Sequence, residues 1–158
     1  MDVSGPKTLF YKKSTFVTHL PVDYFYSPSH SWIGRQPDGT LRVGLTKFAV
    51  RMLGEMVDHG FEIELNSPVK PGTILGWIEG FKAVSDLFCT ATGTFLGGNA
   101  HLKNRIQSVH EKPYDEGWVY AIKGEPDPRC LHVHDYRTLL DRTIDRILEQ
   151  QKQSEQQH

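Results

Sequence analysis

Short stretches of alternating apolar and polar residues make up most of the chain between residues 24 and 123, and turn residues separate them. Such alternation is typical of strands that bury one face, so it predicts a β-rich core. The clearest pair of strands covers residues 30–35 and 41–45, and the segment between them contains Asp38-Gly39. Asp-Gly is a frequent hairpin turn, so we expect these two strands to pair.

A short helix is expected directly after this hairpin. Thr46 can cap it, apolar residues follow at helical spacing as far as Leu53, and Gly54 supplies a stop. Alternating apolar residues over 61–65 then predict a half-exposed strand, and the Pro- and Gly-containing segment 66–72 predicts a turn.

Two further strands are expected over residues 73–79 and about 84–91. They flank the four residues Gly-Phe-Lys-Ala at positions 80–83. Gly80 stands where a tight reversal needs a permissive backbone. We therefore expect Lys82 at or beside the tip of a hairpin.

The remaining elements of the core are shorter. The pair Gly97-Gly98 is expected to end a strand that contains residues 94–96. Asn99 can then cap a helical turn that reaches about Arg105. The last predicted strand covers residues 118–123.

A longer helix is predicted near the C-terminus, over residues 135–151. Its apolar residues fall on one stripe at helical spacing, with most charged residues outside it, and the stripe contains Leu139, Leu140, Ile144, Ile147 and Leu148. We expect this helix to pack on the core of its own chain. Residues 152–158 are polar throughout and are predicted to be disordered.

Composition and charge narrow the classes of function. The 158 residues include 18 basic and 19 acidic side chains, a net charge of −1, which fits one domain. Nucleic-acid binding is disfavoured because it needs a concentrated basic surface. Residues 51–130 nevertheless hold eleven acidic against eight basic residues. These acids could form an ordinary solvated face or a surface that steers partners, and they include Glu55, Asp58, Glu62, Glu64, Glu79 and Asp86.

The two cysteines, Cys89 and Cys130, are expected to be free thiols. The N-terminal stretch has no apolar run long enough for a secretory signal or a membrane span, so we expect a cytoplasmic protein without membrane attachment. Cys130, His132 and His134 alternate along the chain, as zinc ligands can. A structural zinc site wants a fourth ligand, so an exposed polar segment is the favoured interpretation and metal binding the alternative.

No familiar catalytic motif occurs in the sequence. It lacks the phosphate-binding motif Gly-x-x-x-x-Gly-Lys-Ser/Thr, the dinucleotide-binding motif Gly-x-Gly-x-x-Gly and the hydrolase motif Gly-x-Ser-x-Gly. It also lacks His-Glu-x-x-His and Cys-x-x-Cys. Lys82 stands out instead, because a predicted turn presents it and acidic residues flank it on both sides, as suits enzymatic acylation. From these residues alone, a solvated surface lysine remains the simpler interpretation.

Several longer motifs decide between these interpretations. They follow one another in the order His30-x-Trp32, Val43-Gly-Leu-Thr46-x-Phe-Ala49, Leu53-Gly-Glu55, Glu79-x-x-Lys82-Ala-Val-Ser-Asp86, Gly93 eleven residues after the lysine, Asn99-x-x-Leu102, and Pro113-Tyr-x-x-Gly117-Trp118. With these motifs, the region from about Tyr24 to Ile122 resembles the H-protein family of the glycine cleavage system, a family of lipoyl carriers.

The resemblance implies a fold and a division of the chain. The fold is mainly β, a flattened barrel or sandwich of the lipoyl-domain type (barrel-sandwich hybrid), with short helices and a C-terminal helix. The expected parts are an N-terminal extension over residues 1–22, a lipoyl-carrier domain over 23–134, a packed helix over 135–151 and a disordered tail over 152–158.

The resemblance also assigns roles to residues. Lys82 is expected to carry lipoate covalently, and Glu79 and Gly93 are expected to help modifying enzymes to recognise the domain. Phe81 and Ala83 stand where biotin carriers typically have methionines, which favours a lipoyl carrier. Such a carrier is expected to be a monomer that catalyses nothing itself, since the reactive centre belongs to the cofactor.

The partners implied by the resemblance are four enzymes. A pyridoxal-phosphate glycine decarboxylase would load an aminomethyl group, a tetrahydrofolate-dependent aminomethyltransferase would remove the one-carbon unit, and dihydrolipoyl dehydrogenase would reoxidise the arm. A lipoate ligase or octanoyltransferase would attach the arm to Lys82.

Four departures from the family pattern leave the pathway open, namely Ser31, Gly80, His110 and the segment 57–72. Carriers similar to H protein also occur in lipoate relay and in sulfur oxidation, so a lipoyl carrier of another pathway is the alternative function. An unmodified β scaffold or metal-binding module is the third.

Overall fold

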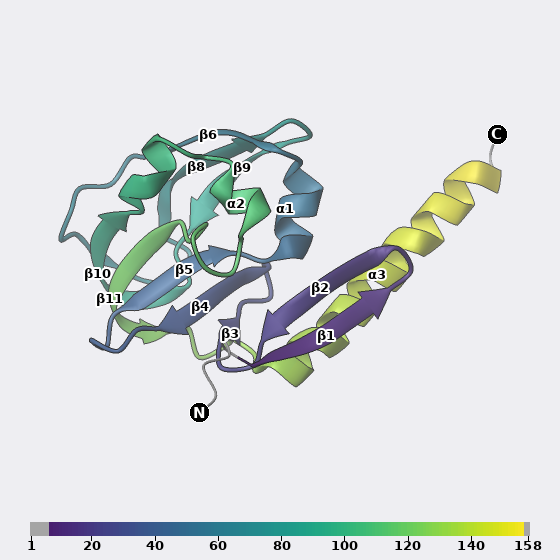
Figure 1. Cartoon of the computed structure of the whole chain (residues 1–158), viewed down its shortest axis with the longest axis horizontal. Helices are drawn as coiled ribbons and strands as arrows, with labels where there is room; N and C mark the ends of the chain where they lie inside the picture. The colour runs from purple at the N-terminus through teal and green to yellow at the C-terminus, as the bar shows by residue number, and fades with distance from the viewer. Residues whose placement is uncertain (1–6, 157–158) are drawn as a thin grey trace, which may run out of the picture.

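Two antiparallel sheets form the body of the protein (Figure 1). The computed structural model describes residues 7–156. The larger sheet has the strand order β3 (Phe25–Tyr26), β4 (Ser31–Arg35), β5 (Leu41–Leu45), β11 (Tyr120–Pro126), β10 (Ala91–Gly98) and β7 (Pro68–Val69). The smaller sheet has the order β6 (Met56–Phe61), β8 (Ile74–Gly80) and β9 (Val84–Phe88).

One apolar core lies between the two sheets. Ile33 and Ile122 of the larger sheet belong to the same buried cluster as Leu75 and Ile78 of the smaller one. Their removal from water supplies the main driving force for this arrangement. The prediction of a mainly β sandwich with short helices and a C-terminal helix is therefore confirmed, with both sheets open at their edges.

The first predicted hairpin and the helix after it are confirmed. β4 and β5 pair antiparallel, and α1 (Lys47–Leu53) follows. The Thr46 hydroxyl accepts a hydrogen bond from the Ala49 amide at 3.3 Å, and the Gly54 amide donates to the Val50 carbonyl at 2.8 Å. Each contact satisfies a backbone group that the end of a helix would otherwise leave unpaired.

Two predictions about strands are wrong. The strand expected over residues 61–65 lies earlier, as β6, because residues 56–61 are the ones that pair with β8. Gly97-Gly98 does not end its strand, since β10 continues through both glycines with an irregularity between Phe95 and Gly97. In both cases pairing with a neighbouring strand, rather than the local pattern, sets the boundary.

The helical turn after β10 agrees with its prediction. The Asn99 side chain accepts a hydrogen bond from the His101 amide at 3.1 Å and caps the 3₁₀ turn η1 (Ala100–Lys103). A further short helix, α2 (Ser108–Glu111), was not predicted.

The first two strands and the last helix of the described chain form a unit beside the sandwich. A hairpin of β1 (Thr8–Lys13) and β2 (Phe16–Pro21) packs along α3 (Val133–Gln156) (Figure 1). The Tyr11 hydroxyl donates to Asp141 at 2.8 Å, and Lys13 pairs with Asp145 at 2.9 Å. We call these two elements the terminal unit.

α3 is longer than predicted at both ends. It packs on its own chain as expected, but it includes residues 152–156, for which disorder was predicted. A helix adds one hydrogen bond for each residue that joins it, and this stretch has no glycine or proline to stop it. Residues 157–158 lie outside the described part of the chain. No helix within residues 7–156 is both long and apolar enough to cross a membrane.

Candidate functional site

Lys82 lies at the tip of the hairpin between β8 and β9, as predicted. Three backbone hydrogen bonds fix the tip. The Gly80 amide donates to the Ala83 carbonyl at 2.9 Å, the Phe81 amide to Glu55 at 2.9 Å, and the Lys82 amide to Leu53 at 2.8 Å. The last two bonds tie the tip to the C-terminal end of α1 and the start of β6.

The side chain of Lys82 is exposed. Its Nζ donates a hydrogen bond to the Arg51 carbonyl at 3.3 Å, and it forms no ion pair with any residue between 7 and 156. An exposed amine on a fixed backbone can be reached by an enzyme without unfolding of its surroundings. The geometry therefore suits covalent modification of Nζ.

Glycine is needed at position 80 for a different reason from the one predicted. It is absent from the residues with positive φ, so the turn does not require a left-handed backbone. A Cβ at this position would instead lie far inside van der Waals contact of the Leu53 carbonyl oxygen. The close approach of the tip to the end of α1 thus requires the smallest residue at this position.

Glu79 and Gly93 occupy different places relative to the tip. Glu79 is half-buried in β8, where it pairs with Val84 on one side and Asp58 on the other. Gly93 lies in β10 of the larger sheet and pairs with Gly124. The structure thus brings Glu79, but not Gly93, into the hairpin that carries Lys82.

A shallow recess of about 310 Å³ lies between Lys82 and α1. Its charged or titratable lining comes from Lys47, Arg51, Lys82, His110 and Glu55. Of these five side chains only Glu55 is acidic. The acidic surface suggested by the composition is therefore not continuous around Lys82, since the side toward α1 is basic.

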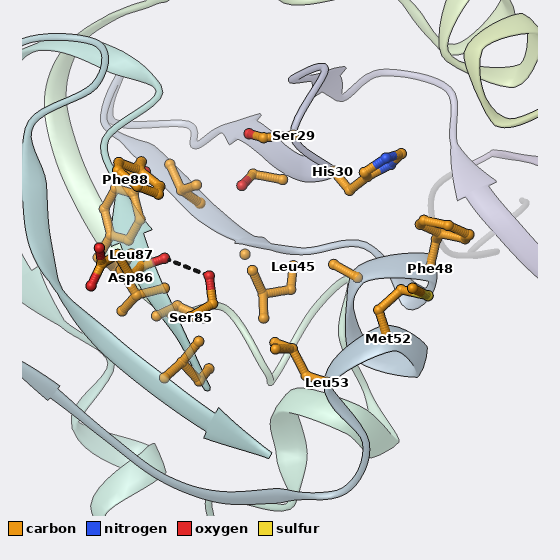
Figure 2. Close-up of a pocket in the computed structure, with 17 residues that line it drawn as sticks. Ser29, His30, Leu45, Phe48, Met52, Leu53, Ser85, Asp86, Leu87 and Phe88 are labelled. Carbon is orange, nitrogen blue, oxygen red and sulfur yellow. Dashed lines mark hydrogen bonds between the residues drawn. The ribbon is translucent and has the colours of Figure 1, made fainter. Parts of the chain in front are cut away.

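An apolar cavity of about 270 Å³ lies near the base of the same hairpin (Figure 2). Leu45, Leu53 and Ile78 contribute to its lining, which also includes the polar residues Ser29 and Ser85. Ile78 pairs with Ser85 across β8 and β9, one pair further from the tip than Glu79 and Val84. A space of this kind can receive an alkyl chain with a polar end.

His30 connects this cavity to the terminal unit. Its Nδ1 lies 2.8 Å from the Tyr136 hydroxyl of α3, which donates in turn to Thr46 at 3.0 Å. With Tyr136 donating to Thr46, the Nδ1 proton of His30 donates to Tyr136. Burial lowers the pKa of His30 to about 4, so the imidazole is neutral at pH 7.

The thiols and the possible metal ligands do not form a second site. Cys89 is buried, and burial raises its pKa. Burial also raises the pKa of Cys130 to about 11, so both thiols stay protonated and unreactive at neutral pH. Within the described chain, no group of three or more His, Cys, Asp or Glu side chains is arranged to hold a metal ion.

Sequence reasoning missed the contacts that hold the tip. The Arg51, Leu53 and Glu55 carbonyls all accept hydrogen bonds from the tip, and no side-chain pattern signals a backbone acceptor. It also missed the contact of Phe16 with α1, because β1 and β2 were not predicted. Here the Arg51 guanidinium lies 5.9 Å from the centre of the Phe16 ring.

Comparisons with known proteins agree with this geometry. The family described as "Glycine cleavage H-protein" matches residues 24–140, which leaves out the β1–β2 hairpin and residues 141–156 of α3. A glycine cleavage system H protein from Corynebacterium jeikeium is 36% identical over 124 residues, which cover 77% of this chain and 97% of the relative. One from Opitutus terrae is 34% identical over 127 residues, with 78% and 99% covered.

A solved structure shows the same fold. The glycine cleavage system H protein from Mycobacterium marinum superposes with a TM-score of 0.65 at 31% identity, and the match covers 74% of this chain and 95% of that one. Sequence and fold therefore agree over most of the chain. The chain belongs to the glycine cleavage H-protein family.

Proposed function

We propose that this protein is the lipoyl carrier of a glycine cleavage system, with lipoate joined to Lys82 by an amide bond. The observation that carries the proposal is the tip itself, where an exposed lysine stands on a backbone fixed by hydrogen bonds to α1 and β6. The tip holds its position while the Lys82 side chain is exposed to solvent. A swinging arm needs this combination, because a fixed attachment point determines which sites the flexible arm can reach.

The residues around the tip fit a lipoyl group. Nζ is accessible for attachment, and the apolar side chains of Leu45, Leu53 and Ile78 offer a surface that would hold the alkyl chain of the arm. When bound, lipoate would supply a disulfide that accepts two electrons, and one of the two sulfurs released in this way would carry the aminomethyl group. The chain's own part is to present and shelter this group, and it performs no catalytic step.

The same proposal names the partners. A glycine decarboxylase, an aminomethyltransferase and dihydrolipoyl dehydrogenase would each meet the arm in turn, and a lipoate ligase or octanoyltransferase would attach it. Glu79 remains a proposed contact for the attaching enzyme, since it lies in the lysine's own hairpin. We place the carrier in the cytoplasm with these enzymes.

Intact-mass measurement after incubation with lipoate, ATP and a lipoate–protein ligase tests the proposal. We expect one lipoyl amide on the wild-type protein and none on Lys82→Arg, because the guanidinium stays charged and is a poor acyl acceptor. Peptide mapping should place the added mass on Lys82. Modification of Lys82→Arg to the same extent as wild type would contradict the assignment.

A second measurement tests the pathway. The lipoylated protein should stimulate exchange of glycine carboxyl with carbon dioxide by a purified glycine decarboxylase, and the unmodified protein should not. Full lipoylation of Lys82 without any stimulation would favour a carrier for another pathway, such as lipoate relay or sulfur oxidation.

A further inference from the structure

The exposed side of α1 next to Lys82, which we call the α1 face, carries Lys47 and Arg51 and has the composition of a binding surface. Phe81, which directly precedes Lys82 at the tip, is 78% exposed, and Met52 of α1 is 52% exposed on the side of α1 that lines the apolar cavity. Exposed aromatic, methionine and arginine side chains are enriched where proteins bind one another. α1 itself contributes Lys47 and Arg51 and has no acidic residue. A partner that presents carboxylates would complement the basic recess lined by Lys47, Arg51 and Lys82.

The terminal unit holds Arg51 in place. Phe16 of β2 lies under the Arg51 guanidinium, and its ring meets Phe48 of α1 edge-on at 5.8 Å between ring centres. The hairpin that carries Phe16 is itself held to α3 through Tyr11 and Lys13. A cation above an aromatic face is attracted to it, which restricts the orientations the arginine samples. A partner then loses less side-chain entropy when it binds.

The position of Nζ indicates which partner uses this face. Nζ donates to the Arg51 carbonyl at 3.3 Å, so an enzyme that acts on Nζ has to approach α1 closely. The enzymes that act on the disulfide meet the far end of a long arm instead. We propose that the α1 face, with Arg51 as its main charge, is the docking surface for the enzyme that attaches the lipoyl group, and that this enzyme meets it with carboxylates.

This inference rests on the proposed function, since it concerns the attachment step. In that step the neutral Lys82 amine attacks the carboxyl carbon of lipoyl-adenylate, the N–C bond forms and the bond to AMP breaks; the nitrogen loses one proton to solvent and keeps one in the amide. Arg51 takes no part in these bond changes. It orients the carrier so that Nζ points toward the donor.

Initial rates of lipoylation test the proposal on the full chain, with a purified lipoate–protein ligase, lipoate and ATP. At low salt, Arg51→Glu should raise the KM for the carrier about three- to fivefold and leave kcat unchanged. Glu55→Lys, which makes the charge of the same recess more positive instead of more negative, should lower the KM for the carrier. Arg146→Glu is the matched control, because this arginine is exposed on α3 and does not line the recess beside Lys82, so its KM should equal that of wild type.

Phe16 supplies a second, independent variant. Phe16→Leu keeps the Arg51 charge but removes the ring beneath it, so the KM for the carrier should rise, though less than in Arg51→Glu. Phe16→Tyr keeps an aromatic ring there and should have the wild-type KM. Phe10→Leu is the control, since Phe10 is an exposed phenylalanine of the same hairpin. Circular dichroism should show all variants folded.

The outcomes separate this inference from the proposed function. An unchanged or lowered KM in Arg51→Glu would overturn the docking surface, while complete lipoylation at long times would still support the carrier role. A raised KM only toward the glycine decarboxylase would assign the face to that enzyme and also overturn the inference. Absence of lipoylation from the wild-type protein would contradict the proposed function itself.

Discussion

At the scale of single residues, Gly93 has a packing role that the sequence did not reveal. Its φ is 155°, and a Cβ at this position would overlap the Lys123 carbonyl oxygen of β11. The strands β10 and β11 approach closely there because Gly93 faces Gly124. This contact explains the glycine without any contact to a modifying enzyme, which remains a prediction for Gly93.

Substitution of Gly93 separates the two roles. Gly93→Ala should lower the free energy of unfolding by about 1–3 kcal/mol, because the added methyl group forces two strands apart. Urea denaturation measures this change. Gly72→Ala is the control, since Gly72 also has a positive φ, 90°, but no atom lies near its Cβ position. Equal, small losses in both variants, with slower lipoylation of Gly93→Ala alone, would favour recognition over packing.

At the scale of elements, local signals predicted those parts of the fold that local contacts form. Thr46 and Gly54 mark both ends of α1, and Asp38-Gly39 marks the turn between β4 and β5. The β1–β2 hairpin escaped prediction because its buried residues are covered by α3, about 130 positions further along the chain. The same distance explains why the terminal unit could not be inferred.

The candidate site shows the same division. The place of Lys82 at a hairpin tip followed from strand pattern and a turn glycine. The basic recess beside it did not, because Lys47, Arg51 and His110 come together only when α1 and α2 pack next to the tip. The count of charges along the chain predicted an acidic surface, whereas the folded surface on the α1 side of Lys82 is basic.

Shortening α3 tests how the terminal unit is held together. A chain that ends at Leu148 should unfold with the wild-type free energy within about 0.5 kcal/mol, because residues 149–156 are all exposed. A chain that ends at Leu139 should lose at least about 4 kcal/mol, since Leu140 and Ile144 are buried against the hairpin. It also lacks Asp141 and Asp145.

Thermal or urea unfolding measures both truncations, and limited proteolysis reports on the β1–β2 hairpin. Rapid cleavage of the hairpin should occur only in the shorter chain. A large loss of stability from removal of residues 149–156 alone would contradict this account.

At the scale of the whole molecule, one hydrogen-bonded group joins the sandwich to the terminal unit. His30, Tyr136 and Thr46 belong to the loop before β4, to α3 and to the cap of α1. The pKa of His30 is about 4 in the folded protein, below its ordinary value of 6.5, because burial disfavours the imidazolium. Protonation of His30 therefore destabilises the folded state, in which this group is hydrogen-bonded.

The stability of the protein should depend on pH accordingly. The unfolded chain binds the proton more tightly, so the contribution of His30 is complete above pH 6.5, falls between pH 6.5 and pH 4, and changes no further below that. The loss should be about 2–3 kcal/mol.

Urea unfolding at pH 7.5 and pH 4.5 measures this loss. His30→Asn is the comparison, because asparagine does not titrate and tolerates the positive φ of 72° at this position. The variant should lose about 2 kcal/mol less than wild type over this interval. Parallel pH profiles for the two proteins would show that His30 is not the responsible group.

The last turns of α3 extend from the body of the molecule and contact none of the described core. In Figure 1 these turns point away from both sheets. A biotin group or solid support coupled to this end would leave the lysine hairpin open to solution. Surface immobilisation through α3 is therefore a practical way to measure how fast each enzyme associates with the carrier.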